Sequence, residues 1–338
     1  MIDTKLLSDN EEDLKISAEF LKNGEIVGMP TETVYGLAAD ACNPEAVAKI
    51  FEAKGRPSDN PLIVHIADIE KLSEIAYNIP DLAYRLAEAF WPGPLTMILP
   101  KKDCIPSITS GGLDTVGVRM PSHIVARKMI SYSGLPIAAP SGNISGYPSP
   151  TKASHMMRDM YGKIPAVVDG GTCSVGVEST VISFENDNTV RILRPGYITK
   201  EDLQKIADNV IIDSAILEKL SDGQIVRSPG MKYKHYSPSA DVILIDSNYK
   251  DFCCYVNNHS KENTYALVFN GEGSNLSVPF FAYGANGAEQ AHEIFSLLRK
   301  LDDINADTVY VRIPSKDGVG LAVYNRLIRA AGFEVIKL

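Results

Sequence analysis

The sequence has few of the residues that build disulfide frameworks or zinc sites. Its 338 residues include five cysteines, none of which forms a CxxC pair or has a histidine at metal-ligand spacing. An odd number of cysteines without such spacing supports neither kind of site. We therefore expect a protein of a reducing compartment, the cytoplasm.

Long apolar runs are also missing. No stretch approaches the ~18 apolar residues that a membrane-spanning helix needs. Residues 1–12, MIDTKLLSDNEE, are acidic where a signal peptide would be basic. The sequence thus predicts a soluble protein that has no membrane partner.

Positively charged residues are fewer than negatively charged ones. The chain has 33 lysines and arginines but 42 aspartates and glutamates, which gives a net charge of -9. Tight, sequence-independent binding of nucleic acid depends on many lysine and arginine contacts to phosphates. We therefore expect at most a weak contact with RNA. The P-loop pattern GxxxxGK[ST] and the dinucleotide fingerprint GxGxxG are absent as well.

The length and composition are those of a folded chain with more than one core. A chain of 338 residues exceeds the size at which a single hydrophobic core keeps growing. The composition, with 45% hydrophobic and 22% charged residues, is typical of globular proteins. Two domains are therefore expected.

Hydrophobic periodicity and turn residues predict an alternation of strands and helices. Residues 1–210 are expected to form an α/β domain with a mixed sheet, residues 211–240 a linker, and residues 241–338 a small doubly wound α/β domain. Strands are predicted near 25–29, 62–66, 95–99, 116–120, 137–139, 167–169, 179–184, 190–193, 242–245, 265–269 and 308–313, with a further strand at the end of the chain. Helices are predicted near 14–21, 43–55, 81–90, 122–132, 151–160, 288–301 and 321–331.

Polar side chains gather around glycines and prolines between residues 29 and 65. The segments MPTETVYGL and KGRPSDNPLIVH contain hydroxyls, cations, an asparagine and a histidine. Asn43 as N-cap, Pro44 at the first helical position and Gly55 as the stop place Lys54 and Arg56 at the end of a helix. This pattern indicates an anion site. Alternatively, cations at a helix carboxyl end simply stabilise the helix dipole.

Seven motifs, in this order and spacing, resemble the YrdC-like family in its two-domain form, the threonylcarbamoyl-AMP synthases. They are PTETVYG (30–36), KGRPSDNPL (54–62), WPGPLT (91–96), VRMP (118–121), APSGNISG (139–146), EST (178–180) and LRPG (193–196). Residues 228–238, SPGMKYKHYSP, look like the interdomain loop of the longer members. The resemblance runs from about residue 10 to the end of the chain. One small departure is Gly142, where many relatives carry alanine.

The resemblance implies a fold and an activity. The expected fold is a twisted mixed sheet with a concave, cationic cavity, followed by a smaller Rossmann-like domain. The expected reaction combines L-threonine, bicarbonate and ATP into L-threonylcarbamoyl-AMP and releases pyrophosphate. A separate transferase would use this product to modify adenosine 37 (t6A) of tRNAs that read ANN codons.

The resemblance also implies an amino-acid site. Arg119, at the end of a strand, would bind the threonine carboxylate, although a surface salt bridge is an alternative role. His65 alternates with apolar neighbours, as a core histidine also would. The threonine-binding residues carried over in this way are Thr33, His65, Arg119, Ala139 (through its backbone) and Ser179.

ATP would be held by separate cations and hydroxyls, with Mg²⁺ on its phosphates. Lys54 and Arg56 are the expected catalytic cations, and no residue is a firm general base. The ATP-binding residues implied by the resemblance are Arg56, Asn60, Thr115, Ser141, Ser149, Arg194, His235 and Tyr236. The basic segment around His235 is expected to close over the nucleotide, or else to be a spacer.

Two other functions stay open from the sequence. A non-catalytic RNA-binding module is one, although the net charge weighs against it. Carbamoyl-adenylate chemistry on carbamoyl phosphate is the other, although the acylphosphatase and zinc-finger segments that accompany it are missing here. Threonine-dependent release of pyrophosphate would separate the synthase from both.

Overall fold

The computed structural model describes residues 2–58, 60–216 and 236–338. The chain divides into two compact units. Unit 1 comprises Met1–Ser145 and Ser149–Met231, and unit 2 comprises Gly146–Pro148 and Lys232–Leu338. The first described residues of the predicted linker continue unit 1, since they belong to β11 (Asn209–Ile212) and a 3-10 turn, η2 (Ser214–Ile216).

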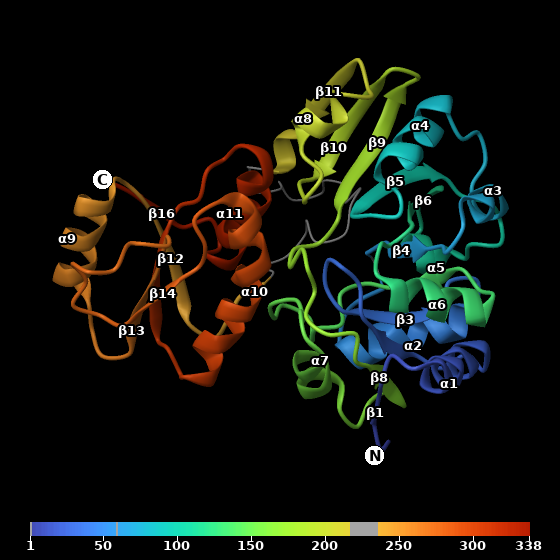
Figure 1. The fold of residues 1–338 in the computed structure, drawn as a ribbon, viewed down its shortest axis with the longest axis horizontal. Helices are drawn as coiled ribbons and strands as arrows, with labels where there is room; N and C mark the ends of the chain where they lie inside the picture. The colour runs from blue at the N-terminus through green and yellow to red at the C-terminus, as the bar shows by residue number, and fades with distance from the viewer. Residues whose placement is uncertain (1, 59, 217–235) are drawn as a thin grey trace. The chain divides into compact units, whose positions relative to one another are not determined.

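Unit 1 is built on a mixed sheet that has eleven strands among the described residues (Figure 1). In spatial order they are β1 (Lys5–Leu7), β8 (Ala166–Val168), β2 (Val27–Met29), β3 (Gly36–Asp40), β7 (Ile137–Ala138), β4 (Ile63–His65), β6 (Thr115–Arg119), β5 (Leu95–Pro100), β9 (Thr180–Asn186), β10 (Thr189–Arg194) and β11. Parallel and antiparallel pairings both occur, and β9 and β10, at the predicted strands 179–184 and 190–193, pair antiparallel as a hairpin. The predicted mixed sheet is confirmed.

The helices of unit 1 follow from local signals in the sequence. They are α1 (Glu11–Lys22), α2 (Pro44–Lys54), α3 (Leu72–Ile75), α4 (Asp81–Phe90), α5 (Ser107–Ser110), α6 (Ile124–Ser133), α7 (Ala153–Met160) and α8 (Lys200–Leu203), with a 3-10 turn, η1 (Ile69–Lys71). In α2 the side chain of Asn43 accepts hydrogen bonds from the first turn, and Gly55 ends the helix in the left-handed region, with φ of 61°. Both caps were predicted, and they fix where Lys54 and Arg56 leave the helix.

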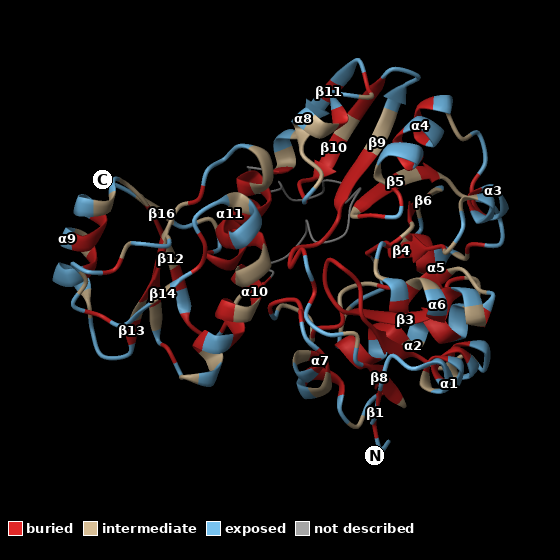
Figure 2. Cartoon of the chain, in the orientation of Figure 1, coloured by how far each residue is buried: buried red, intermediate tan, exposed pale blue. Residues whose placement is uncertain are grey.

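One half of the large sheet is covered by α1 and α6. Leu14 and Leu21 of α1 and Met129 and Ile130 of α6 pack on β1, β2, β3 and β8 in a single buried cluster. Figure 2 shows the central strands of this sheet as buried residues. The strands on the other side of β7, from β4 to β10, carry polar groups that this cluster does not include.

Unit 2 is a small parallel sheet with helices on both faces (Figure 1). Its strands, in spatial order, are β14 (Phe280–Ala282), β13 (Thr264–Val268), β15 (Thr308–Arg312), β12 (Asp241–Asp246) and β16 (Val335–Lys337). Its helices are α9 (Tyr249–His259), α10 (Gly287–Asp303) and α11 (Gly318–Ala330). Phe252 and Val256 of α9 pack on the face of β12 and β13 that carries Ile245 and Ala266. This arrangement agrees with the predicted doubly wound α/β domain.

Candidate active site

Strand register brings most of the predicted site residues of unit 1 onto one face of the large sheet. Residues paired across adjacent strands point to the same side, as do residues two apart along a strand. His65 is paired with Arg119 across β4 and β6. The pairings among β6, β5, β9 and β10, and among β4, β7 and β3, extend this face in both directions. Its polar and small residues include Thr96, Thr115, Ala139, Ser141, Ser179 and Arg194.

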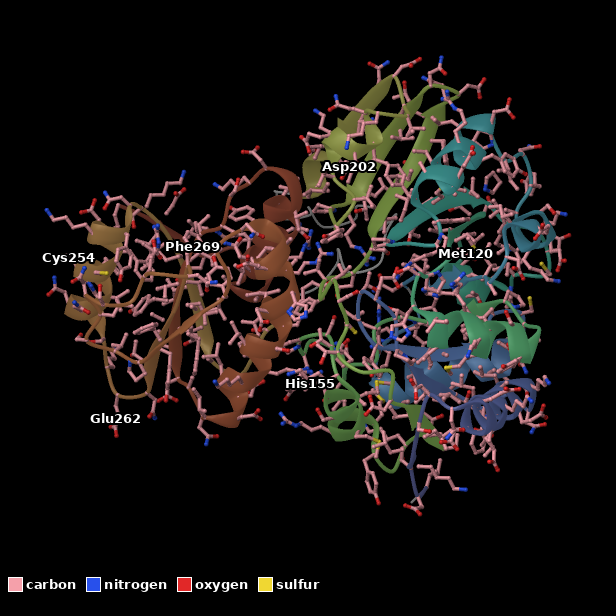
Figure 3. The ribbon with its side chains drawn as sticks, in the orientation of Figure 1. Met120, His155, Asp202, Cys254, Glu262 and Phe269 are labelled. Atoms are coloured by element: carbon pink, nitrogen blue, oxygen red, sulfur yellow. The ribbon has the colours of Figure 1, made fainter. Side chains whose placement is uncertain are left out.

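Arg119 is the most strongly anchored cation of this face. Its Nη2 lies 2.7 Å from Oε1 of Glu32, its Nη1 donates to Oγ1 of Thr33 at 2.9 Å, and its Nε donates to the carbonyl of Gly93 at 3.3 Å. Arg119 is 3% exposed. Its position in unit 1 can be found in Figure 3 from the label of the next residue, Met120. A guanidinium has five N–H donors, so donors beyond these three contacts can bind a carboxylate in a fixed orientation.

Two titratable groups beside Arg119 have shifted pKa values. Burial alone would raise the pKa of Glu32, but the charge and hydrogen bond of Arg119 hold it below its ordinary value. Burial, and then the charge of Arg119, lower the pKa of His65 to about 3. At neutral pH Glu32 is therefore a carboxylate and His65 a neutral imidazole. Nδ1 of His65 has no hydrogen-bond partner among the described residues, so it can still bind a ligand.

A second cation binds the hydroxyl of Ser179, which directly precedes β9 and contacts a hydroxyl of β5. Arg194, at the end of β10, donates from Nε to the carbonyl of Ser179 and from Nη2 to its hydroxyl, both at 3.1 Å. The same hydroxyl lies 2.7 Å from Oγ1 of Thr96. A residue predicted to bind ATP, Arg194, thus contacts one predicted to bind threonine, Ser179.

Ser149 is linked to the same region through Glu178. Its hydroxyl donates to Oε1 of Glu178 at 2.6 Å, and both side chains are buried. Glu178 directly precedes Ser179 in the chain. A predicted nucleotide contact is therefore hydrogen-bonded to the residue that precedes a predicted threonine contact.

Lys54 is buried at the end of α2 and is bonded to a neighbouring loop. Its ammonium donates to the backbone carbonyl of Ser141, and to that of Asn143 at 2.6 Å. These bonds hold the predicted ATP contact Ser141 in place. Arg56 follows two residues later, half-buried, with its backbone N–H bonded to the carbonyl of Phe51 at 3.0 Å.

Asn60 is a buried amide without hydrogen-bond partners. It is 0% exposed, and neither its side-chain oxygen nor its nitrogen is bonded among the described residues. Such a group costs roughly 1 to 3 kcal/mol unless a ligand or water satisfies it. Thr115 lines a small, mostly apolar pocket with Pro61 and Leu62, the two residues that follow Asn60 in the chain. This region suits a ligand that offers both a hydrogen-bonding group and an apolar surface.

Three predicted site residues lie away from these contacts or outside the described part of the chain: Ala139, His235 and Tyr236. The backbone N–H of Ala139 is bonded to the carbonyl of Ile63 at 3.0 Å, which leaves its carbonyl as the backbone group for a ligand. His235 lies outside the described residues, as do Arg227, Lys232 and Lys234 of the basic segment. Tyr236 is buried in unit 2, where its ring centroid lies 5.2 Å from that of Phe295.

The sequence analysis did not single out several residues that this site uses. Glu32 and Glu178 lie inside the quoted motifs PTETVYG and EST, yet nothing in a motif says which charge a carboxylate will meet. Thr96 carried a usable signal, because it is a polar residue within the predicted strand 95–99. Asn143 contributes only its backbone carbonyl to Lys54, a role that side-chain chemistry does not indicate.

The described residues contain neither a metal-ligand cluster nor a membrane-spanning helix. Among residues 2–58, 60–216 and 236–338, no group of three or more histidine, cysteine, aspartate or glutamate side chains is arranged to hold a metal ion. None of the described helices combines the length and the apolar character needed to cross a bilayer.

Comparison with known proteins decides the family. Residues 19–196 match the Sua5_yciO_yrdC family, described as "Telomere recombination". The chain belongs to this family. Residues 198–332 match a second family, described as "Threonylcarbamoyl-AMP synthase, C-terminal domain". The predicted resemblance is thereby confirmed over both parts of the chain.

The relatives of this Sua5-type chain are similar over nearly their whole lengths. A threonylcarbamoyl-AMP synthase of Pyrococcus abyssi is 45% identical over 96% of this chain and 96% of its own length. One of Bacillus subtilis is 42% identical over 99% of this chain and 97% of its own length. The crystal structure of P. abyssi Sua5 complexed with L-threonine has a TM-score of 0.91 at 42% identity and covers 99% of this chain and 100% of that one. The assignment to transferases of this class follows, whereas the roles of individual residues stay predictions.

Proposed function

We propose that this protein synthesises L-threonylcarbamoyl-AMP from L-threonine, bicarbonate and ATP and releases pyrophosphate. The observation that carries the proposal is the buried, triply anchored Arg119 beside neutral His65, on a face lined with hydroxyls and further cations. Relatives of nearly the same length bear the synthase name, and one was solved with L-threonine.

The amino acid would bind around Arg119. Its carboxylate would take the donors of Arg119 that Glu32, Thr33 and Gly93 leave available. A neutral His65 suits the threonine hydroxyl better than an imidazolium would, because a neutral ring nitrogen can accept a hydrogen bond. Ser179, held by Arg194, and the carbonyl of Ala139 would complete the pocket.

ATP would bind along the neighbouring polar groups. Asn60, Thr115, Ser141 and Ser149 offer amide and hydroxyl contacts, and the cations Lys54, Arg56 and Arg194 supply positive charge. Charge builds up on the equatorial oxygens of the α-phosphate and on the departing pyrophosphate, so cations fixed in advance lower the barrier. His235 and Tyr236 are proposed as further nucleotide contacts.

The chemistry needs no covalent intermediate with the enzyme. The uncharged amine of threonine attacks the carbon of bicarbonate or CO2 to give a carbamate, with water lost in the bicarbonate case and a proton released to solvent in the CO2 case. A carbamate oxygen then attacks the α-phosphorus of ATP, and the bond to the pyrophosphate oxygen breaks. The protein contributes mainly orientation of the two reactants and stabilisation of charge.

Magnesium would arrive as part of the substrate. We propose that Mg²⁺ binds the ATP phosphates and enters the site with them. The product would then pass to a transferase that acts on adenosine 37 of tRNAs reading ANN codons. With a net charge of -9, the chain would itself contact tRNA weakly at most.

An isotope experiment tests the proposal. The purified protein is incubated with ATP, Mg²⁺, L-threonine and ¹³C-bicarbonate, and the nucleotide products are identified by mass. The expected product is threonylcarbamoyl-AMP that carries the label. Unlabelled AMP or ADP alone, or a product without threonine, would refute the assigned reaction.

A further inference from the structure

Glu32 is part of the site, although it does not belong to the predicted contacts of either substrate. Its side chain is about 5% exposed and lies 2.7 Å from Nη2 of Arg119. Buried ion pairs cost desolvation energy and are weak sources of stability, so a buried pair inside a binding site calls for another explanation.

The surroundings of Glu32 enclose its carboxylate completely. Both of its oxygens are buried. Its negative charge acts to raise the pKa of His65, His123 and Cys173. For the two histidines this effect opposes a larger lowering by burial, and for Cys173 it adds to the rise that burial causes. All three groups therefore lie near Glu32. The backbone carbonyl of Glu32 accepts a hydrogen bond from the N–H of Val175 at 2.7 Å, which fixes the segment that carries the carboxylate. Glu32 is thus held from its backbone as well as from Arg119.

This environment argues against a role for Glu32 in proton transfer. A general base must reach the proton that it accepts and must have a pKa near the working pH. The oxygens of Glu32 are enclosed, and the ion pair with Arg119 favours the ionised form. The contact through which Glu32 can influence the site is therefore its ion pair with Arg119.

We propose that Glu32 is a positioning residue, which holds the guanidinium of Arg119 in the orientation that receives the carboxylate of the amino-acid substrate. The inference rests on the proposed function of the site. Arg119 has a long, flexible side chain, and Glu32, Thr33 and Gly93 fix three different nitrogens of its planar group. Without Glu32, Nη2 of Arg119 loses its ion-pair partner. The guanidinium can then rotate, so that its remaining N–H donors no longer point toward the substrate carboxylate.

Three substitutions at one position separate geometry from charge. Glu32→Gln keeps an oxygen at the same reach for Arg119 but removes the charge. Glu32→Asp keeps the charge but withdraws it by one methylene, and Glu32→Ala removes both. If orientation is what matters, the KM for threonine rises in the order wild type, Gln, Asp, Ala, with Gln within about threefold of wild type and Ala at least tenfold above it. The KM for ATP and the kcat at saturating threonine change less than about threefold.

The controls make each outcome decisive. Glu25→Gln breaks an ion pair with Lys49 that is 40% exposed, and it should leave all constants near wild type. Thermal unfolding shows which variants fold. If the alanine variant does not fold, the relative KM values for threonine of the Gln and Asp variants still test the proposal. A charge-only role predicts that Asp outperforms Gln. A proton-transfer role predicts that Gln is as inactive as Ala, and either result overturns the proposal.

Direct binding of threonine, measured by calorimetry without ATP, separates this inference from the proposed function. If wild-type protein neither binds threonine nor releases pyrophosphate, the proposed function fails. If wild type does both and every Glu32 variant binds threonine equally well, only the positioning role is wrong.

Discussion

At the scale of single residues, the site combines a buried charge pair with a neutral imidazole. Removing one partner from a buried ion pair typically costs about 3 to 5 kcal/mol, because the other charge is left uncompensated. Removing either side chain is therefore expected to destabilise the fold, and a substitution that keeps a hydrogen bond between the two positions is expected to cost less. His65, next to Arg119 in the sheet register, contributes to the pH dependence of stability instead.

The first prediction concerns His65 and acid. The pKa of this histidine is about 3 in the folded chain and 6.5 when unperturbed, so the unfolded chain binds the proton first as the pH falls. This lowers the free energy of unfolding between pH 6.5 and about 3, by up to about 1.4 kcal/mol per pH unit. The free energy of unfolding is measured with urea at about pH 7 and pH 5. Its decrease between these two pH values should be about 2 kcal/mol smaller for His65→Asn than for wild type. Equal losses would contradict the assigned pKa.

The second prediction concerns Arg56. If its charge stabilises the departing pyrophosphate, Arg56→Ala should lower turnover more than tenfold while the protein stays folded. Pyrophosphate release at saturating substrates measures the effect. Retention of more than about a tenth of wild-type turnover, a barrier change of roughly 1.4 kcal/mol or less, would exclude that role.

At the scale of elements, the loop after β7 depends on α2 and α7. Lys54 at the end of α2 binds the carbonyls of Ser141 and Asn143, and Gly142 between them donates its N–H to the carbonyl of Tyr35 at 2.8 Å. The other side of Gly142 faces the sulfur end of Met156 in α7, where a β-carbon would overlap Sδ and Cε. Glycine at position 142 thus leaves room for a large side chain in α7.

The third prediction follows from this packing. Gly142→Ala should lower the free energy of unfolding by about 1 to 3 kcal/mol, because Met156 must move within a closed core. In the double variant with Met156→Val, the added methyl group finds room, so the double loss should be smaller than the sum of the single losses. Chemical denaturation of the four proteins measures the coupling. Strictly additive losses would show that the two residues do not compete for space.

The elements that sequence analysis predicted well are those with local signals. The caps of α2 are read directly from Asn43, Pro44 and Gly55, and strands β9 and β10 from the two apolar runs at 179–184 and 190–193. Strand β3 was not predicted, because Gly36–Asp40 follows a motif full of turn residues and becomes a strand only by pairing with β2 and β7. Helix α9 was missed as well, and there Cys253 is buried and Cys254 exposed, as helical geometry allows.

At the scale of the whole molecule, family matches cover both parts of the chain, residues 19–196 and 198–332. Apart from His235, which lies outside the described residues, and Tyr236, every predicted site residue belongs to unit 1. The motifs named these residues, but the contacts among them depend on strand register. The pairs Arg119–Glu32 and Ser149–Glu178 join positions 87 and 29 residues apart in the chain, and no local pattern encodes such pairs.

The most direct test of the account is pyrophosphate release by the purified protein, measured with ATP, Mg²⁺ and bicarbonate in the presence and absence of L-threonine. We predict release that requires threonine, falls when bicarbonate is depleted, and is restored when the missing substrate is added back. Release that is the same with and without threonine, or no release from folded protein, would contradict the assignment of this face to amino-acid and nucleotide binding.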